Sequence, residues 1–266
     1  MTQKYKPHIL ALSSLFTFGN AVIIMSGLNL FNLLMCFALA LIMIFLAMYL
    51  FNLSQKNKFI YFCAVAFVCA TAIYSVAITF LDYIKFLKNE QLPQTSVLLL
   101  GIAFAVTVAF FTISKTTAIY KYSLFVFVLI VAIMAICFVG GIKSFDYQNL
   151  DIRALSFSFS LKNFMRFFVS LVALVFFVKT DKRDIKPMFF GVSIGFLMLL
   201  VAMLQIMLTF GANSNISFPY LKSISVISSG SLFTRLDGLV WFVFFITALI
   251  KTAVCIEVVK NCIIKQ

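Results

Sequence analysis

Eight long apolar runs divide this chain of 266 residues, and they constrain its fold more than any other feature. About 20 consecutive apolar residues are enough to cross the hydrocarbon core of a bilayer as a helix. A soluble domain has no room for eight such runs, and 64% of these residues are apolar, against ~45–50% in ordinary soluble domains. The sequence therefore predicts an all-α polytopic membrane protein with a single membrane domain over residues 1–266. Its expected transmembrane helices are 8–26, 29–52, 59–84, 96–114, 119–142, 157–178, 187–210 and 237–259.

The distribution of charge predicts how these helices are oriented. The chain has 21 basic and eight acidic residues, which give a formal charge of +13. In a soluble protein this excess would suggest a nucleic-acid partner, but here the basic residues lie in short loops, as in the cytoplasmic loops of membrane proteins. With the N-terminus inside, twelve basic residues fall on the cytoplasmic side and seven outside, and 179–186 is the most basic loop. We therefore expect a lipid-embedded protein with both termini in the cytoplasm and no nucleic-acid partner.

Motifs for enzymatic or metal chemistry are missing from the sequence. The six cysteines lie in or beside apolar runs without C-x-x-C spacing, and His8 is the only histidine, which argues against a zinc or haem site. The chain has no Walker motif, no G-x-S-x-G and no H-E-x-x-H. We expect no metal, no cofactor and no enzymatic activity.

The segment 218–255 combines several polar landmarks before and within the last apolar run. This pattern resembles a signature of the spore germination permease family. These proteins are the integral-membrane B subunits of germinant receptors, within the amino acid–polyamine–organocation transporter superfamily. The stretches "FTFGNAVIIMSG" and "FTISKTTAIYKYSLF" are similar to further regions of that family. The matching residues in the main segment are Phe218, Pro219, Arg235, Leu236, Asp237, Trp241 and Lys251.

The resemblance implies a fold and a function. Family members usually have ten helices in two inverted five-helix repeats, so this chain would be a shortened version with about eight. It would bind a small nutrient such as an amino acid and signal germination to other germinant receptor subunits in the bacterial cytoplasmic (spore inner) membrane. Two alternatives stay open: a proton- or sodium-coupled amino-acid secondary transporter, and a shortened non-transporting paralogue.

The resemblance also implies a ligand cavity near the bilayer midplane between the first, third, sixth and eighth runs. Gly19 and Asn20 interrupt the first run, where a broken helix would expose backbone groups to a ligand. The alternative for these polar residues is close helix packing and interhelical hydrogen bonding. The expected ligand-binding residues are Thr17, Gly19, Asn20, Tyr74, Ser158 and Ser160.

Charged residues at or in the predicted helices suggest gating or coupling roles. Lys251 lies roughly 13 Å from the inner end of the last run, so its ammonium should face the protein interior or an inner water-filled vestibule. Arg166 should likewise face protein or water, or extend to the outer interface. The expected gating or coupling residues are Lys251, Arg235 and Asp237, although Arg235 and Asp237 also fit a helix start. Gly191 and Gly195 form a G-x-x-x-G pair that predicts close helix packing.

Overall fold

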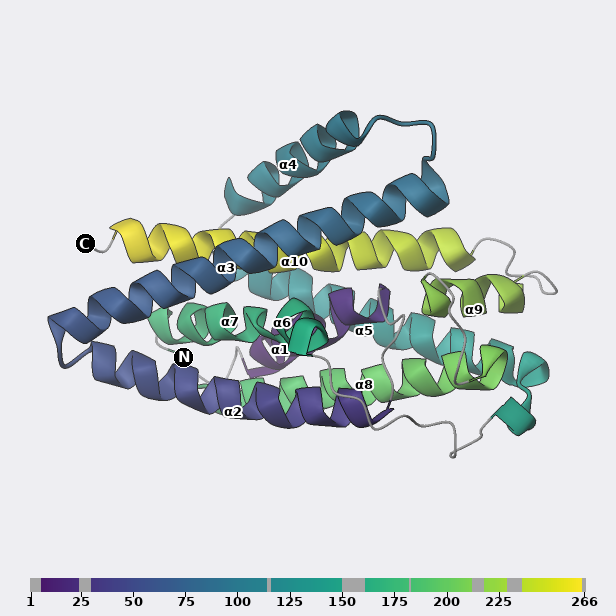
Figure 1. The fold of residues 1–266 in the computed structure, drawn as a ribbon, viewed down its shortest axis with the longest axis horizontal. Coiled ribbons are helices and arrows are strands. Elements are labelled where there is room, and N and C mark those ends of the chain that lie inside the picture. The colour runs from purple at the N-terminus through teal and green to yellow at the C-terminus, as the bar shows by residue number, and fades with distance from the viewer. Residues whose placement is uncertain are drawn as a thin grey trace.

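The computed structural model describes residues 6–23, 30–113, 116–149, 161–181, 183–211, 218–228 and 236–264. Every regular element in these ranges is helical, and Figure 1 shows their arrangement. The α-helices are α1 (Lys6–Ile23), α2 (Leu30–Ser54), α3 (Lys58–Phe86), α4 (Val97–Ile113), α5 (Thr116–Gly141), α6 (Leu161–Phe168), α7 (Ser170–Thr180), α8 (Lys186–Phe210), α9 (Pro219–Ser228) and α10 (Leu236–Ile264). Short helical turns follow α3 and α5, at Leu87–Gln91, Ile142–Ser144 and Tyr147–Asn149.

Each predicted apolar run coincides with helical structure, and most of the helices are long enough to cross a bilayer. Within the described ranges, six helices are long and apolar enough to cross a bilayer. Two predicted spans are not among them: α4, which has 17 residues, and α1, which carries several polar residues. The chain is therefore an all-helical, multi-pass membrane protein. The six long apolar segments are Leu30–Ser54, Lys58–Asn89, Thr116–Ser144, Asn163–Thr180, Lys186–Phe210 and Gly238–Cys262.

The structure differs from the expected helices at two places. The sixth run is divided at Val169, where a turn separates α6 from α7 and the Val172 N–H donates to the Val169 carbonyl at 3.1 Å. The predicted outer loop 211–236 contains a helix, α9, which begins at Pro219. Proline suits a first helical turn because its missing N–H has no partner there in any case. Periodicity did not reveal α9, because it has only ten residues.

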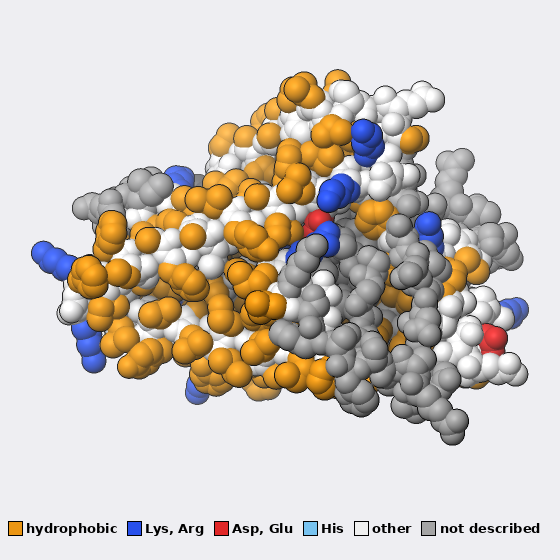
Figure 2. Space-filling model, in the orientation of Figure 1, with side chains coloured by type: hydrophobic (Ala, Val, Ile, Leu, Met, Phe, Trp, Pro, Cys, Tyr) orange, Lys and Arg blue, Asp and Glu red, His pale blue; other side chains and the backbone are white. Residues whose placement is uncertain are grey.

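The helices form an inner and an outer group. Residues 170–178 of α7 are all buried, and Ala11, Leu12 and Phe18 of α1 have no exposed surface. In contrast, hydrophobic side chains cover most of the described surface over α2, α3 and α4 (Figure 2). In a bilayer, apolar side chains lose nothing by facing lipid, so the polar residues decide which helices lie inside.

Close packing between α1 and α8 depends on the two glycines of the G-x-x-x-G pair. A Cβ atom at Gly195 would lie 2.7 Å from the Ser14 carbonyl oxygen, and one at Gly191 would overlap the Leu10 carbonyl oxygen. Only hydrogen atoms fit at these positions, so the two backbones come into direct contact. The predicted packing role of the pair is confirmed.

Several helix ends meet at one end of the bundle, toward the left in Figure 1. There the His8 ring donates from Nδ1 to the Tyr120 carbonyl oxygen at 3.2 Å, which joins the starts of α1 and α5. The Arg183 guanidinium lies 4.0 Å from the centre of the Tyr120 ring and 2.5 Å from the Asp181 carboxylate. The basic segment 179–186, predicted to be cytoplasmic, is thus held through Arg183 to the start of α5, which His8 joins to α1.

Candidate functional site

The buried helix α1 carries a row of hydroxyl groups that bond to backbone carbonyls. The Ser14 hydroxyl donates to the Gly191 carbonyl of α8 at 2.8 Å, and the Thr17 hydroxyl donates to Ser13 of its own helix at 3.0 Å. Both side chains have no exposed surface. Such bonds are required where no water is available to pair a hydroxyl group. Thr17, a predicted ligand contact, therefore has a backbone partner and lies against Gly195 of α8.

Gly19, a second predicted ligand contact, lies where α1 crosses α10. A Cβ atom at this position would lie 2.8 Å from the Thr247 hydroxyl oxygen and 3.0 Å from its Cβ. Glycine therefore permits the contact between the two helices. Residues four apart share one face of a helix, so Lys251 lies one turn beyond Thr247 on the face of α10 that meets α1.

Lys251 is buried inside the bundle, with 3% of its surface exposed. This confirms that the side chain faces the protein interior. None of the ion pairs between described residues includes it. Asp82 of α3 and Cys255 of α10 lie near enough to interact electrostatically with its amine. Lys251 therefore lies buried between α10 and α3.

Asp82 and Arg166 form an ion pair that joins α3 to α6. The Arg166 Nε donates to one carboxylate oxygen of Asp82 at 2.8 Å, and an Nη donates to the other oxygen. Two parallel bonds of this kind are the strongest pairing that a guanidinium makes with a carboxylate. Asp82 is 7% exposed. The pair explains how Arg166 is accommodated beside the membrane core, since each charge neutralises the other.

Our sequence reasoning missed Asp82, although a signal was present. It is the only acidic residue in the run 59–84, and an ionisable residue in a membrane span has a function or a partner by default. With Asp82 included, the charged residues that are buried inside the described bundle are Lys251 and Asp82, one positive and one negative. Because the part-buried Arg166 already pairs with Asp82, the Lys251 ammonium is the charge that suits an anionic group such as a carboxylate.

The remaining predicted site residues are placed as follows. Tyr74 of α3 is 38% exposed, on the outside of the bundle. Asn20 lies in α1 and Asp237 in α10, but their side chains are outside the described part of the structure. Ser158, Ser160 and Arg235 also lie outside the described residues. A ligand-binding or gating role for these residues stays a prediction.

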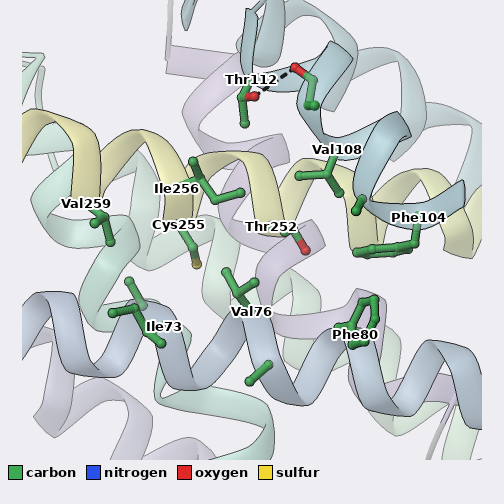
Figure 3. Close-up of a pocket in the computed structure, with 14 residues that line it drawn as sticks. Ile73, Val76, Phe80, Phe104, Val108, Thr112, Thr252, Cys255, Ile256 and Val259 are labelled. Carbon is green, nitrogen blue, oxygen red and sulfur yellow. Dashed lines mark hydrogen bonds between the residues drawn. The ribbon is translucent and has the colours of Figure 1, made fainter. Parts of the chain in front are cut away.

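Two large cavities are lined by described residues, and neither includes the predicted ligand contacts Thr17, Gly19 or Tyr74. One of about 560 Å³ lies between α3, α4 and α10 (Figure 3). The other, of about 540 Å³, lies where the ends of α2, α7 and α10 meet the start of α3, and it includes Lys179 and Asn261. Within the described ranges, the buried charges rather than a cavity define the candidate site.

Comparison of the chain with protein-family models, with curated proteins and with solved structures finds no match. The function of the chain is therefore inferred from its own residues and their arrangement. The described residues of the site contain two cations, a carboxylate, a thiol and several hydroxyl groups that are bonded to backbone. This set can bind and orient a small charged molecule.

Proposed function

We propose that this chain is the permease-like membrane subunit of a spore nutrient germinant receptor. It binds a small nutrient such as an amino acid and passes the signal to other receptor subunits in the spore inner membrane, with both termini in the cytoplasm. The resemblance of segment 218–255 to the spore germination permeases supports this proposal. The single observation that carries it is the buried amine of Lys251, which belongs to that segment and lies near Asp82 of α3.

The energetics of Lys251 favour a binding role. A lysine in the middle of a transmembrane helix costs about 2.5–3.5 kcal/mol on insertion scales. Asp82 does not offset this cost fully, because its two carboxylate oxygens are already bonded to Arg166. The carboxylate of an amino acid would provide the missing negative charge, and a low-dielectric interior strengthens this attraction. We infer that the Lys251 ammonium binds the carboxylate of the nutrient.

A coupled amino-acid transporter is the second candidate, and the same charge favours it. Transporters built from inverted repeats bind cations beside a broken helix near the midplane. The buried ammonium of Lys251 would take the place of such a cation, while α1 itself is one continuous helix over Lys6–Ile23. The receptor and the transporter therefore share the binding step and differ in whether the amino acid crosses the membrane.

The test is a binding screen on the purified chain in lipid nanodiscs. Each of the common L-amino acids is added separately, and the thermal unfolding midpoint is measured. A ligand at 100 times its dissociation constant stabilises the folded state by ~2.7 kcal/mol, so binding raises the midpoint. We expect one or a few amino acids to do so in the wild type and in Lys260→Met, whose lysine side chain is 56% exposed. Lys251→Met should lose the shift.

Two outcomes would contradict the proposal. If no amino acid raises the midpoint, or if Lys251→Met responds as the wild type does, Lys251 does not bind a nutrient carboxylate. If an amino acid does raise the midpoint, its uptake is measured in radiolabelled form in proteoliposomes under a proton or sodium gradient. Absence of uptake supports the receptor, whereas gradient-driven uptake supports the transporter.

A further inference from the structure

The cavity between α3, α4 and α10 is elongated along the helix axes (Figure 3). Its α3 wall extends from Ala72 to Phe80 and its α10 wall from Thr252 to Val259. At 1.5 Å per residue these walls are ~10–12 Å long. Because α3 and α10 are two of the membrane-spanning helices, the long dimension of the cavity follows the direction in which lipid chains extend.

The lining of the cavity offers almost no hydrogen-bonding capacity to an occupant. Most of the lining side chains are apolar, and the two hydroxyl groups are already bonded to their own helices. The Thr252 hydroxyl donates to the Ala248 carbonyl at 2.8 Å, and the Thr112 hydroxyl donates to the Ala109 carbonyl at 2.8 Å. The third polar group, the Cys255 thiol, is only a weak hydrogen-bonding group. A polar ligand or water would therefore find few partners in this cavity, whereas hydrocarbon needs none.

The surroundings of the cavity are apolar and face lipid. Ile102, Val106 and Phe110 of α4 are 57%, 50% and 71% exposed, and Ile73 of α3, which lies at the edge of the cavity, is 60% exposed. An occupant can thus enter from the hydrocarbon core of the bilayer without passing through water.

The cavity is large enough for a hydrocarbon chain. It holds about 560 Å³. A hydrocarbon chain is much thinner than a protein helix, which is ~10 Å wide with its side chains, and can lie along the walls between α4 and the α3–α10 pair.

We propose that this cavity is a binding site for one acyl chain of a membrane phospholipid, held between α4 and the α3–α10 pair. The chain fills space that would otherwise be a void beside Cys255 and Thr252, one turn from Lys251. This inference goes beyond the proposed nutrient-binding role and does not depend on it.

The test is photocrosslinking in nanodiscs whose phosphatidylglycerol carries a diazirine midway along one acyl chain. Adducts are located by mass spectrometry of peptides. In the wild type we expect adducts on the cavity-lining segment Thr252–Val259, in addition to those on the lipid-facing residue Phe110.

The decisive variant fills the cavity. Ala105 and Ala109 lie one turn apart on α4 and both line it. In Ala105→Leu/Ala109→Leu, adducts on Thr252–Val259 should fall about tenfold, a loss equivalent to ~1.4 kcal/mol of binding, while those on Phe110 stay unchanged. The matched control is Ala103→Leu, which adds the same group to the same helix at an exposed residue that does not line the cavity.

Three results would overturn the proposal. The first is the absence of adducts on Thr252–Val259 in the wild type while Phe110 is labelled. The second is their persistence in the filled variant. The third is a crosslink from this segment to another protein chain instead of lipid, which would identify the occupant as a helix. The wild-type measurement decides the question even if the filled variant does not fold.

Discussion

Helices α1 and α4 differ in polarity and in burial, and the two differences run in opposite directions from those of a soluble protein. In α1, Ser13, Ser14 and Thr17 have no exposed surface, and Gly19 contacts α10. In α4, which is almost entirely apolar, only Leu100, Phe104 and Val108 are buried. The less hydrophobic helix is therefore inside, and the more hydrophobic one faces lipid. This order follows from the solvent, because hydrocarbon accepts apolar side chains but leaves polar groups without partners.

Inner helices and the lipid-facing helix α4 are also held in place by different kinds of interaction. Inner helices make polar and charged contacts and approach each other through glycine. Helix α4 is held by side-chain packing, in which Phe104 lies 5.6 Å from Phe80 and 5.5 Å from Tyr83 between ring centres. Substitutions should therefore be costly in the interior and mild on the lipid-facing side.

The largest effect is expected when the interior ion pair loses one partner. Asp82→Asn leaves the Arg166 guanidinium without its carboxylate. Breaking a buried pair in this way costs about 3–5 kcal/mol, and because the Arg166 side chain is 24% exposed we expect the lower end of this range. The control is Asp181→Asn, because the Asp181 side chain is 35% exposed, against 9% for Asp82, and its pair with Arg183 should contribute less. Thermal unfolding in nanodiscs compares the two variants. Equal stability of Asp82→Asn and the wild type would show that the pair does not hold α3 to α6.

The double variant Asp82→Asn/Arg166→Gln sharpens this comparison. Both charges are removed together, so no uncompensated charge remains beside the membrane core. We expect it to be more stable than Asp82→Asn alone. The single variant Arg166→Gln is measured as well. If the double variant loses as much stability as the two single variants added together, the residues act independently, and the loss in Asp82→Asn does not come from the broken ion pair.

A somewhat smaller effect is expected from adding one methyl group between inner helices. The new Cβ atom in Gly191→Ala would overlap the Leu10 carbonyl oxygen, which belongs to a backbone that cannot rotate away. Overpacking of this kind costs about 1–3 kcal/mol. In Gly101→Ala of α4 the nearest atom is Phe80 Cζ, at 3.2 Å, the tip of a ring that can move. Unfolding midpoints of the two variants should therefore differ, and similar values would refute the close α1–α8 contact.

The smallest loss of stability is expected from truncating a phenylalanine to alanine, and its size should depend on whether the ring is buried or faces lipid. Phe18 of α1 has no exposed surface and lies 5.8 Å from the Phe244 ring, whereas Phe110 of α4 is 71% exposed. Truncating a buried aromatic side chain costs about 3–5 kcal/mol in soluble proteins, but here only the packing part applies, about 2 kcal/mol. Phe110→Ala should change the unfolding midpoint little. A larger loss in Phe110→Ala than in Phe18→Ala would mean that α4 contacts protein at this position.

The sequence was informative where one physical property decides the structure. Apolar length predicted the position of the helices, the spacing of Gly191 and Gly195 predicted a close contact, and depth predicted that Lys251 faces inward. The partner of Arg166 was not predictable, because 84 residues separate it from Asp82 and only the fold brings them together. The outward position of Tyr74 was equally hidden, since an apolar run has too little polar periodicity to mark its inner face.

We propose that the charge of Lys251 serves binding and not stability, and the unliganded stability of Lys251→Met tests this proposal. Removing a desolvated ammonium that belongs to no ion pair between described residues should leave the free energy of unfolding unchanged or raise it by up to ~3 kcal/mol. Asp82→Asn, which breaks a pair, should lower it under the same conditions. A loss in Lys251→Met as large as that in Asp82→Asn would contradict the account, because Lys251 would then hold the helices together.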